Sequence, residues 1–265
     1  MASALACVGL AVSDQTELQQ LVTRAHRAAS QAGVFDGIHV GRWEDDSGAA
    51  LILGWRSGEL LDFIPAYTAG SGGLLADCRL INDDGVAVAK VVDTSGHQLT
   101  AMAFQAEQYR ELRAHGEPVS GPARITALGV DVQIYPDAHA FAASPGSQLT
   151  PSDGGEPPPH YRERGWTWPP RLGAESFISY GVFDAPDRAR PRALLSGTVL
   201  RAGQRVCTLT GQPFTVATVT TAGFAADVCL AASEHPGPPA PGTIISGTVS
   251  LCAAFVAPLP CCGPA

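Results

Sequence analysis

The residues best suited to recognition chemistry lie together in one proline-rich stretch. This stretch contains Tyr161, Arg162, Arg164, Trp166, Trp168 and Arg171. In an extended backbone alternate side chains share a side, so Trp166 and Trp168 face the same way, and two packed indoles bury a large apolar area. Two interpretations stay open. Either the indoles pin the stretch onto a neighbouring domain, or they form a recognition segment for a partner protein or ligand, in which the three arginines bind anionic groups.

Catalytic chemistry has no recognisable motif in this chain. The sequence lacks the G-x-S-x-G, P-loop, H-E-x-x-H and dinucleotide-binding glycine patterns. Glu44-Asp45-Asp46 could bind a cation, but such a run is typical of a solvated hairpin tip, and His97 falls where a surface turn histidine is expected. The sequence therefore identifies no catalytic residue, predicts no metal and no cofactor, and favours a non-enzymatic role without deciding the question.

Composition indicates a folded, acidic protein. Of 265 residues, 45% are hydrophobic and 16% are charged, which is too apolar for a disordered chain. The net charge is -8, and an acidic chain repels phosphate backbones unless its basic groups cluster. We therefore expect no nucleic-acid partner and favour a protein partner or self-association, with a small molecule as a further possibility.

Cysteine usage and the N-terminus predict a cytoplasmic protein. The chain has seven cysteines and no C-x-x-C pair, and most lie in apolar runs such as Val228-Cys229-Leu230, which is typical of reduced core thiols. No basic residue precedes Asp14, and the first apolar run is too short to span a bilayer. We expect no export signal and no membrane contact.

The first part of the chain predicts a β-α-β-β-β order. Residues 4 to 12 suit a buried strand, and a helix follows in which Asp14 and Glu17 have capping-box spacing and Gly33 is the stop. Strands are predicted at 38–43, 50–55 and 60–67. The motif D-x-S-G-x-x-L occurs from Asp45 and again from Asp93, each time at a predicted hairpin turn.

The rest of the chain predicts more strands and one break. Strands are expected at 74–81, 86–93, 97–104 and 125–135, with a short helix from about 105 to 114. Prolines and glycines make 144–173 a semi-rigid linker, and an all-β region follows. We therefore predict a mixed α+β domain at 1–143, the linker at 144–173, a β-barrel domain at 174–258 and a tail at 259–265.

The first module resembles the glyoxalase/bleomycin-resistance/dioxygenase family, also called the vicinal oxygen chelate superfamily. The residues that carry the resemblance are Val8 to Asp14, the helix, and Trp43 to Leu51. The family builds a curved sheet around a cavity that often holds a divalent metal. Here Cys7 and Ile52 stand at two of its metal-ligand positions. The resemblance therefore implies a glyoxalase-like front half without the metal.

The C-terminal region resembles an OB-fold. The residues that carry the resemblance are Gly197-Thr198-Val199, the run from Thr210 to Ala217, Ala226-Asp227-Val228, and Pro241-Gly242 before Ile244 to Val249. Arg201 and Arg205 are balanced by two acidic residues, so this region lacks the basic groove that binds single strands.

The fold class expected from both resemblances is α+β, predominantly β, with an OB-like small barrel after a glyoxalase-like half. We expect a non-catalytic binding or assembly protein. The alternatives are a metal-independent enzyme or small-molecule sequestering protein that uses the N-terminal cavity, and a factor associated with single-stranded nucleic acid.

Overall fold

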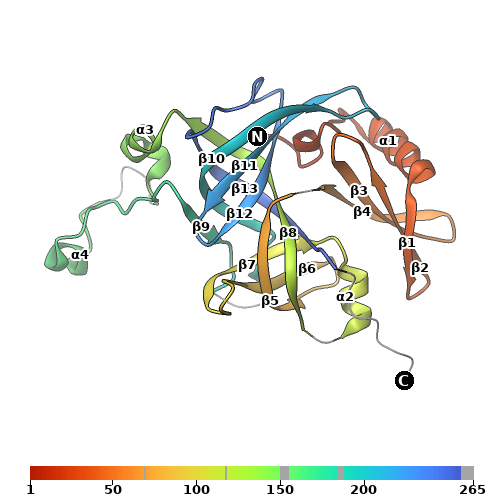
Figure 1. The fold of residues 1–265 in the computed structure, drawn as a ribbon, viewed down its shortest axis with the longest axis horizontal. Coiled ribbons are helices and arrows are strands. Elements are labelled where there is room, and N and C mark those ends of the chain that lie inside the picture. Colours follow the sequence, from red (N-terminus) through yellow and green to blue (C-terminus); the bar gives the residue numbers. More distant parts are fainter. Residues whose placement is uncertain (69, 117, 150–154, 184–187, 258–265) are drawn as a thin grey trace.

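The computed structural model describes the whole chain except residues 69, 117, 150–154, 184–187 and 258–265. The described chain is predominantly β, as the sequence predicts, and forms two sheets (Figure 1). Among the described residues, no helix combines the length and the apolar character that a membrane crossing requires.

The first helix begins as its sequence predicts. In α1 (Gln15–Ala28) the Asp14 carboxylate accepts from the Glu17 amide at 2.9 Å, and the Glu17 carboxylate accepts from the Ser13 amide at 2.7 Å. The helix buries Leu21, Val22 and Ala25. It ends at Ala28 rather than at Gly33, because Ala29 is extended and the chain enters a strand.

A four-stranded antiparallel sheet follows the helix. Its strands, in spatial and chain order, are β1 (Ser30–Phe35), β2 (Ile38–Glu44), β3 (Ala49–Arg56) and β4 (Glu59–Tyr67). The last three match predicted strands, but the strand predicted at residues 4 to 12 is wrong. Those residues form turns around the 3-10 helix η1 (Ala6–Val8). Cys7, Val8 and Leu10 are buried there, so the apolar run reports burial and not an extended backbone.

The larger sheet closes into two rings that share two long strands. The shared strands are β8 (Val119–Tyr135) and β13 (Ile244–Phe255), which pair antiparallel. One ring adds β5 (Gly72–Leu80), β6 (Val86–Val92) and β7 (Gln98–Ala106). The other ring adds β10 (Arg192–Val206), β11 (Pro213–Thr221) and β12 (Phe224–Ala231), and β9 (Ser176–Ser179) extends from β10.

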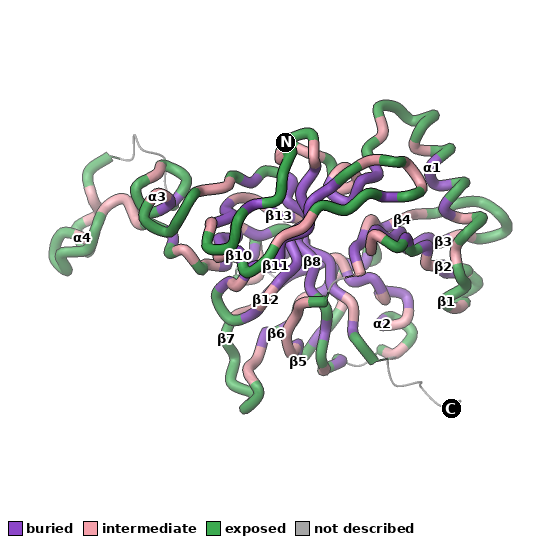
Figure 2. The backbone as a smooth tube through the Cα atoms, turned by 45° about the horizontal axis from the view of Figure 1, so that its top comes forward, coloured by how far each residue is buried: buried purple, intermediate pink, exposed green. Residues whose placement is uncertain are grey.

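This pairing crosses the predicted domain boundary. In the ring of β10 to β13, the closing strand is β8, which pairs parallel with β12 and comes from the region assigned to the first domain. A division between 1–143 and 174–258 therefore runs through a shared wall. One hydrophobic core extends from α1 through both rings, and buried backbone fills the centre of the molecule in Figure 2.

Residues 144–149 and 155–173 form an arm that projects from the body. The described part of this arm holds η2 (Pro145–Ser147) and α4 (Pro159–Arg164), after α3 (Ala138–Ala143). Its two ends are tied together by a β-bridge between Gln148 and Arg171 and by a hydrogen bond from the Leu149 amide to the Pro170 carbonyl at 2.9 Å. Figure 1 shows α4 far from both rings.

Candidate binding cleft

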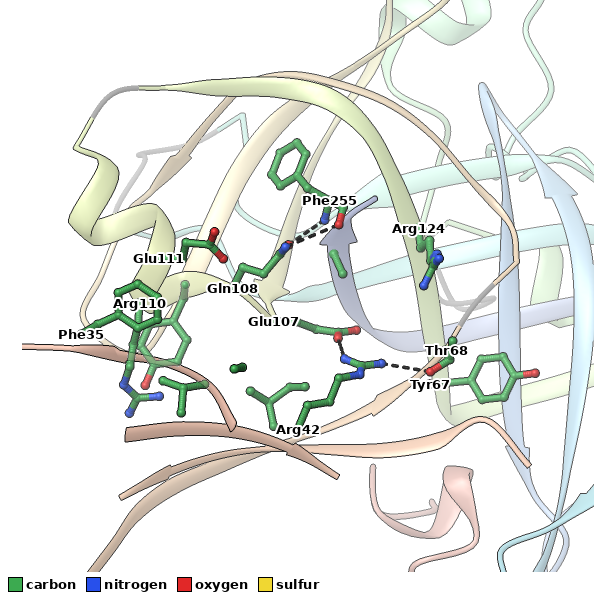
Figure 3. Close-up of a pocket in the computed structure, with 15 residues that line it drawn as sticks. Phe35, Arg42, Tyr67, Thr68, Glu107, Gln108, Arg110, Glu111, Arg124 and Phe255 are labelled. Atoms are coloured by element: carbon green, nitrogen blue, oxygen red, sulfur yellow. Dashed lines mark hydrogen bonds and ion pairs between the residues drawn. The ribbon is translucent and has the colours of Figure 1, made fainter. Parts of the chain in front are cut away.

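A cleft of about 260 Å³ opens where the four-stranded sheet meets the first ring. On one side it is lined from β1, β2, β3 and the end of β4. On the other side it is lined from the segment between β7 and α2 (Tyr109–His115), from α2 itself, and from β8 and β13. Figure 3 shows these side chains converging from both sheets. The cleft therefore depends on the contact between two parts of the fold.

A charged pair occupies the middle of the cleft. The Arg42 guanidinium pairs with the Glu107 carboxylate and also donates to Glu44 at 2.9 Å and to the Thr68 hydroxyl at 3.0 Å. Glu107 is only 7% exposed. Burial raises the pKa of Glu107, although the Arg42 charge opposes the rise. Burial also acts to raise the pKa of Glu44, but hydrogen bonds led by that from Arg42 outweigh it and lower this pKa.

Two further charged side chains line the cleft without such a partner. Arg124 of β8 is exposed and Glu111 of α2 is half-buried. Neither forms a hydrogen bond or ion pair with another described residue. The Arg124 charge acts on Glu44 and Glu107 only at longer range. In Figure 3 Glu111 and Arg124 lie on opposite sides of the Arg42–Glu107 pair.

Apolar side chains form the remaining wall. Val40 and Ile52 are buried on neighbouring strands, and Phe35 and Phe255 also line the cleft. A concave site with an apolar wall and a few placed polar groups is the usual form of a small-molecule site. The cleft can thus hold an apolar group against β2 and β3 while its charged residues bind polar ends.

Side-chain contacts tie the two walls together. The Tyr109 hydroxyl donates to the Asp62 carboxylate of β4 at 2.8 Å, and the buried Arg110 guanidinium pairs with the same carboxylate. The Arg110 guanidinium packs against Gly54 of β3. A Cβ atom at position 54 would be only 2.5 Å from the guanidinium, so the contact requires glycine there. Close to the cleft, the Gln108 side-chain carbonyl accepts from the Phe255 amide at 2.8 Å. The cleft is therefore preformed.

A second tie fixes the sheet to the other ring. The Asp45 carboxylate, at the turn between β2 and β3, accepts from the Thr208 amide at 2.9 Å and from the Thr208 hydroxyl. Its other oxygen accepts from the Ser47 amide at 2.9 Å. Glu44-Asp45-Asp46 is thus not simply a solvated tip, because Asp45 is 7% exposed and joins two parts of the fold.

The side chains that the sequence predicts for recognition lie on the arm. Trp166 is 51% exposed and Trp168 is half-buried. Both contact the Tyr161 ring edge-on, with centroids 5.4 and 5.0 Å away, and the Arg164 guanidinium lies 4.8 Å above Trp166. The interpretation in which the indoles pin the stretch onto a neighbouring domain is wrong within this chain, because both contact Tyr161 of the projecting arm. Their burial against a second copy stays a prediction.

The other two predicted arginines have carbonyl or carboxylate oxygens as partners. Arg171 is at the root of the arm, where it donates to the carbonyls of Ala142 and Ser144 at 2.7 and 2.9 Å. Arg162 lies 3.7 Å from the Glu156 carboxylate, and both are largely exposed. Neither arginine is part of the cleft lining.

The two positions that resemble metal-ligand positions do not meet. Ile52 lines the cleft, whereas Cys7 donates to the Gly129 carbonyl at 3.5 Å in the core, where burial raises the pKa of its thiol to about 12. The described chain contains no group of three His, Cys, Asp or Glu residues placed to hold a metal. All five described cysteines are buried thiols, and Cys261 and Cys262 lie outside the described residues.

Sequence reasoning missed the charged residues of the cleft. Arg42, Glu107 and Arg124 are far apart in the chain, so no motif connects them. The available signal was weak. Arg42 lies in a strand between buried Gly41 and Trp43, and Glu107 follows the apolar run of β7. Charged residues in such runs need partners when they are buried, but the sequence does not name the partner.

Comparison with known proteins identifies no relative of this chain. No family model, curated protein or solved structure matches it. The resemblances to the glyoxalase-like and OB-fold families therefore stay predictions.

Proposed function

We propose that this chain is a non-catalytic protein that binds a small molecule in the cleft. The observation that carries the proposal is a preformed concavity at the junction of two sheets, with the apolar wall of Val40 and Ile52 opposite placed charges. Sites of this kind concentrate at such junctions. The cleft fills the role of the N-terminal cavity that the sequence suggests, although one wall comes from the rings.

The state of Glu107 supports binding over catalysis. A general base needs a free carboxylate within reach of the substrate proton, and the Glu107 carboxylate is committed to Arg42. A metal-independent enzyme is the alternative that the raised pKa of Glu107 favours, because shifted carboxyl groups are common in active sites. Chemical turnover of a cleft ligand that stops in Glu107→Gln would support the enzyme.

A cleft-filling variant tests the site without knowledge of the natural ligand. Ala32 lines the cleft on the exposed edge strand β1, so Ala32→Trp should fill it with little effect on folding. Gln31→Trp is the matched control, since Gln31 is exposed on the same strand but not part of the lining. In a thermal-shift screen of small molecules, compounds that raise Tm should lose their effect in Ala32→Trp and keep it in Gln31→Trp. Compounds that raise Tm by the same amount in Ala32→Trp as in the wild type would contradict the proposal.

A second candidate function is self-association through the arm. Exposed Trp166 with Arg164 against its ring has the composition of an interface anchor. If a second copy covers the arm, sedimentation velocity should show a dimer that becomes a monomer in Trp166→Ala. A wild-type chain that is monomeric at all concentrations would remove this candidate.

We also propose an OB-like arrangement for the ring of β8 and β10 to β13. A five-stranded barrel is the OB architecture, and this ring has five strands. Binding of single strands through it has little support. The aromatic residues of β10 to β13 are Phe214, Phe224 and Phe255, which are all buried and cannot stack on bases. Tyr135, at the end of β8, is half-buried and donates its hydroxyl to the Gln133 side chain at 2.8 Å.

A further inference from the structure

We propose that the ligand of the cleft is an elongated zwitterion, with a carboxylate that binds Arg124, an ammonium that binds Glu111 and a short apolar segment between them. This inference rests on the proposed binding function and adds the chemical class of the ligand. Two compound types share this chemistry, namely an ω-amino acid and a short apolar peptide with free ends.

The unused charges at the two sides of the cleft are the first support. Arg124 and Glu111 both line it, carry opposite charges, and form no ion pair or hydrogen bond with another described residue. A charge at the wall of a partly desolvated cleft gains from an opposite charge brought to it. Since these two side chains lie on opposite sides of the cleft, one ligand can satisfy both only if its own charges are well separated.

The middle of the cleft gives the second support. The Arg42 guanidinium already donates to Glu107, Glu44 and Thr68, so it offers little to an additional anion. Beside this pair lie Val40 and Ile52, which favour an apolar ligand segment. Across the cleft, Arg124 is followed by the apolar wall, where Arg42 is already held by two carboxylates, and then by Glu111. A ligand with carboxylate, methylene chain and ammonium has the complementary order.

The charge balance and the volume exclude larger or singly charged ligands as the best fit. A simple anion would pair with Arg124 and leave Glu111 unpaired, and a simple cation would do the reverse. A dianion would in addition face Glu44 and Glu107, which lie within the range of Arg124. The volume of about 260 Å³ is just below the usual range of roughly 300–1,000 Å³ for ligand sites, so the apolar segment must be short.

Four probes with one six-carbon body separate the charge requirements. They are 6-aminohexanoate, hexanoate, hexylamine and 1-hexanol, and their affinities are measured by isothermal titration calorimetry at low salt. Hydrogen bonds to charged groups contribute enough that each matched end should improve affinity about tenfold. We expect 6-aminohexanoate to bind tightest, hexanoate and hexylamine about tenfold more weakly, and hexanol weakest. The dipeptide Ala-Ala with free ends then distinguishes a peptide from an ω-amino acid.

Two variants that remove one charge each assign the ends. Arg124→Gln should weaken 6-aminohexanoate and hexanoate about tenfold and leave hexylamine unchanged, and Glu111→Gln should do the opposite. Arg162→Gln and Glu163→Gln, which alter exposed charges of the arm, are the matched controls and should change none of the affinities.

The outcomes distinguish this inference from the function on which it rests. If hexanoate or hexylamine binds as tightly as 6-aminohexanoate, and Ala32→Trp abolishes that binding, the cleft is a ligand site but the zwitterion is wrong. The same conclusion follows if hexanol binds best. If 6-aminohexanoate binds Ala32→Trp as tightly as the wild type, it binds outside the cleft and the inference is wrong. If all four probes fail while other compounds bind in the cleft, the inference falls and the proposed function stands.

Discussion

In the cleft, the Arg42 guanidinium is held by Glu44 of its own strand and by two partners that are distant in the chain, Glu107 and Thr68. Its main partner, Glu107, is 7% exposed. In the arm, Arg162 has the Glu156 carboxylate at 3.7 Å, and both side chains are mostly in water. The aromatic residues differ in the same way. Tyr109 is buried and hydrogen-bonded to Asp62 of β4, whereas Trp166 is half exposed and contacts Tyr161 and Arg164, its neighbours in the arm.

The difference shows what each region can contribute. Residues of the cleft are close because the tertiary fold places them together, so their geometry is rigid and their charges act in a partly dry environment. Residues of the arm are close because they are neighbours in the chain, and their contacts are local. We therefore expect substitutions in the cleft to change global stability and ligand binding, and substitutions in the arm to change local order and association.

The largest expected effect is that of Arg42→Ala. This change leaves the Glu107 carboxylate buried without its cation, and breaking a buried pair in this way costs about 3–5 kcal/mol of unfolding free energy. Arg162→Ala in the arm should cost less than about 0.5 kcal/mol, because its pair is exposed. Urea denaturation at neutral pH measures both.

The pH dependence provides a control for Arg42→Ala. Burial raises the pKa of Glu107, and removal of the Arg42 charge raises it further. A carboxyl group with a raised folded-state pKa destabilises the fold when it is ionised. The loss of unfolding free energy in Arg42→Ala should therefore decrease as the pH falls and Glu107 binds a proton. An equal loss at pH 5 and pH 8 would show that Arg42 acts through packing, and the contrast with the arm would be weaker.

Two turns with the same motif sharpen the comparison at an intermediate scale. Asp93 accepts from the Ser95 amide at 2.8 Å and from the His97 amide at 2.9 Å, within its own turn. Asp45 makes the same kind of turn but also binds Thr208 across the fold. Asp45→Ala removes the acceptor of these part-buried hydrogen bonds and should cost about 1–3 kcal/mol, and Asp93→Ala should cost clearly less. Thermal and urea unfolding of both variants measure the difference.

Acidification checks the Asp45 effect. Burial tends to raise the pKa of Asp45, but the hydrogen bonds from Ser47 and Thr208 outweigh burial and hold the pKa below its ordinary 3.8. The stabilisation by Asp45 is therefore complete above that value and is lost as the pH falls through the lower folded-state pKa. The difference in unfolding free energy between the wild type and Asp45→Ala should decrease only below pH 3.8. If Asp45→Ala and Asp93→Ala cost the same, the Thr208 contact contributes nothing.

Local sequence signals predicted the parts of the fold that are local. Asp14 and Glu17 begin α1 as their spacing predicts, and the turn at Asp45 separates β2 from β3. The parallel pairing of β12 with β8 joins Asp227 to Thr126 and could not be predicted, because strand pairing at such distance leaves no local pattern. The cleft could not be predicted for the same reason, because its lining residues come from segments that are far apart in the chain.

The arm shows the opposite error. The sequence identifies the pair of Trp166 and Trp168 because they are close in the chain, and their area favours burial, on a neighbouring domain in one of the two interpretations. Rings on a projecting segment can instead bury area against one another, and Tyr161 serves that purpose here. Proximity in the sequence therefore identified the cluster but not the surface that it packs against.

Within the arm, Trp168→Ala should have the larger of two small effects. The Trp168 indole is half-buried, contacts Tyr161 edge-on and donates to the Gly155 carbonyl at 3.1 Å. An aromatic pair contributes about 0.5–1.5 kcal/mol, but the arm can open without the body, so the loss of global stability should not exceed about 1 kcal/mol. Limited proteolysis should show faster cleavage in the arm. Slower folding or cleavage in the body would contradict this local role.

Trp166→Ala is expected to have the smallest effect on the stability of a single chain. Its amide donates to the Tyr161 carbonyl at 3.0 Å, and this bond survives substitution because it involves only the backbone. The indole is 51% exposed, so little area returns to water when it is removed. The contact with Arg164 is an exposed cation–π pair, worth about 0.5–1 kcal/mol at most, and local opening of the arm reduces its effect further. We expect a loss of unfolding free energy under about 0.5 kcal/mol in urea denaturation.

The dependence on protein concentration distinguishes this outcome from burial of Trp166 by a second copy. If another chain buries Trp166, wild-type stability should rise with concentration and Trp166→Ala should remove the rise. A loss of about 3–5 kcal/mol at every concentration, the usual cost of truncating a fully buried aromatic residue, would mean that the arm packs on the body and that its contrast with the cleft does not exist.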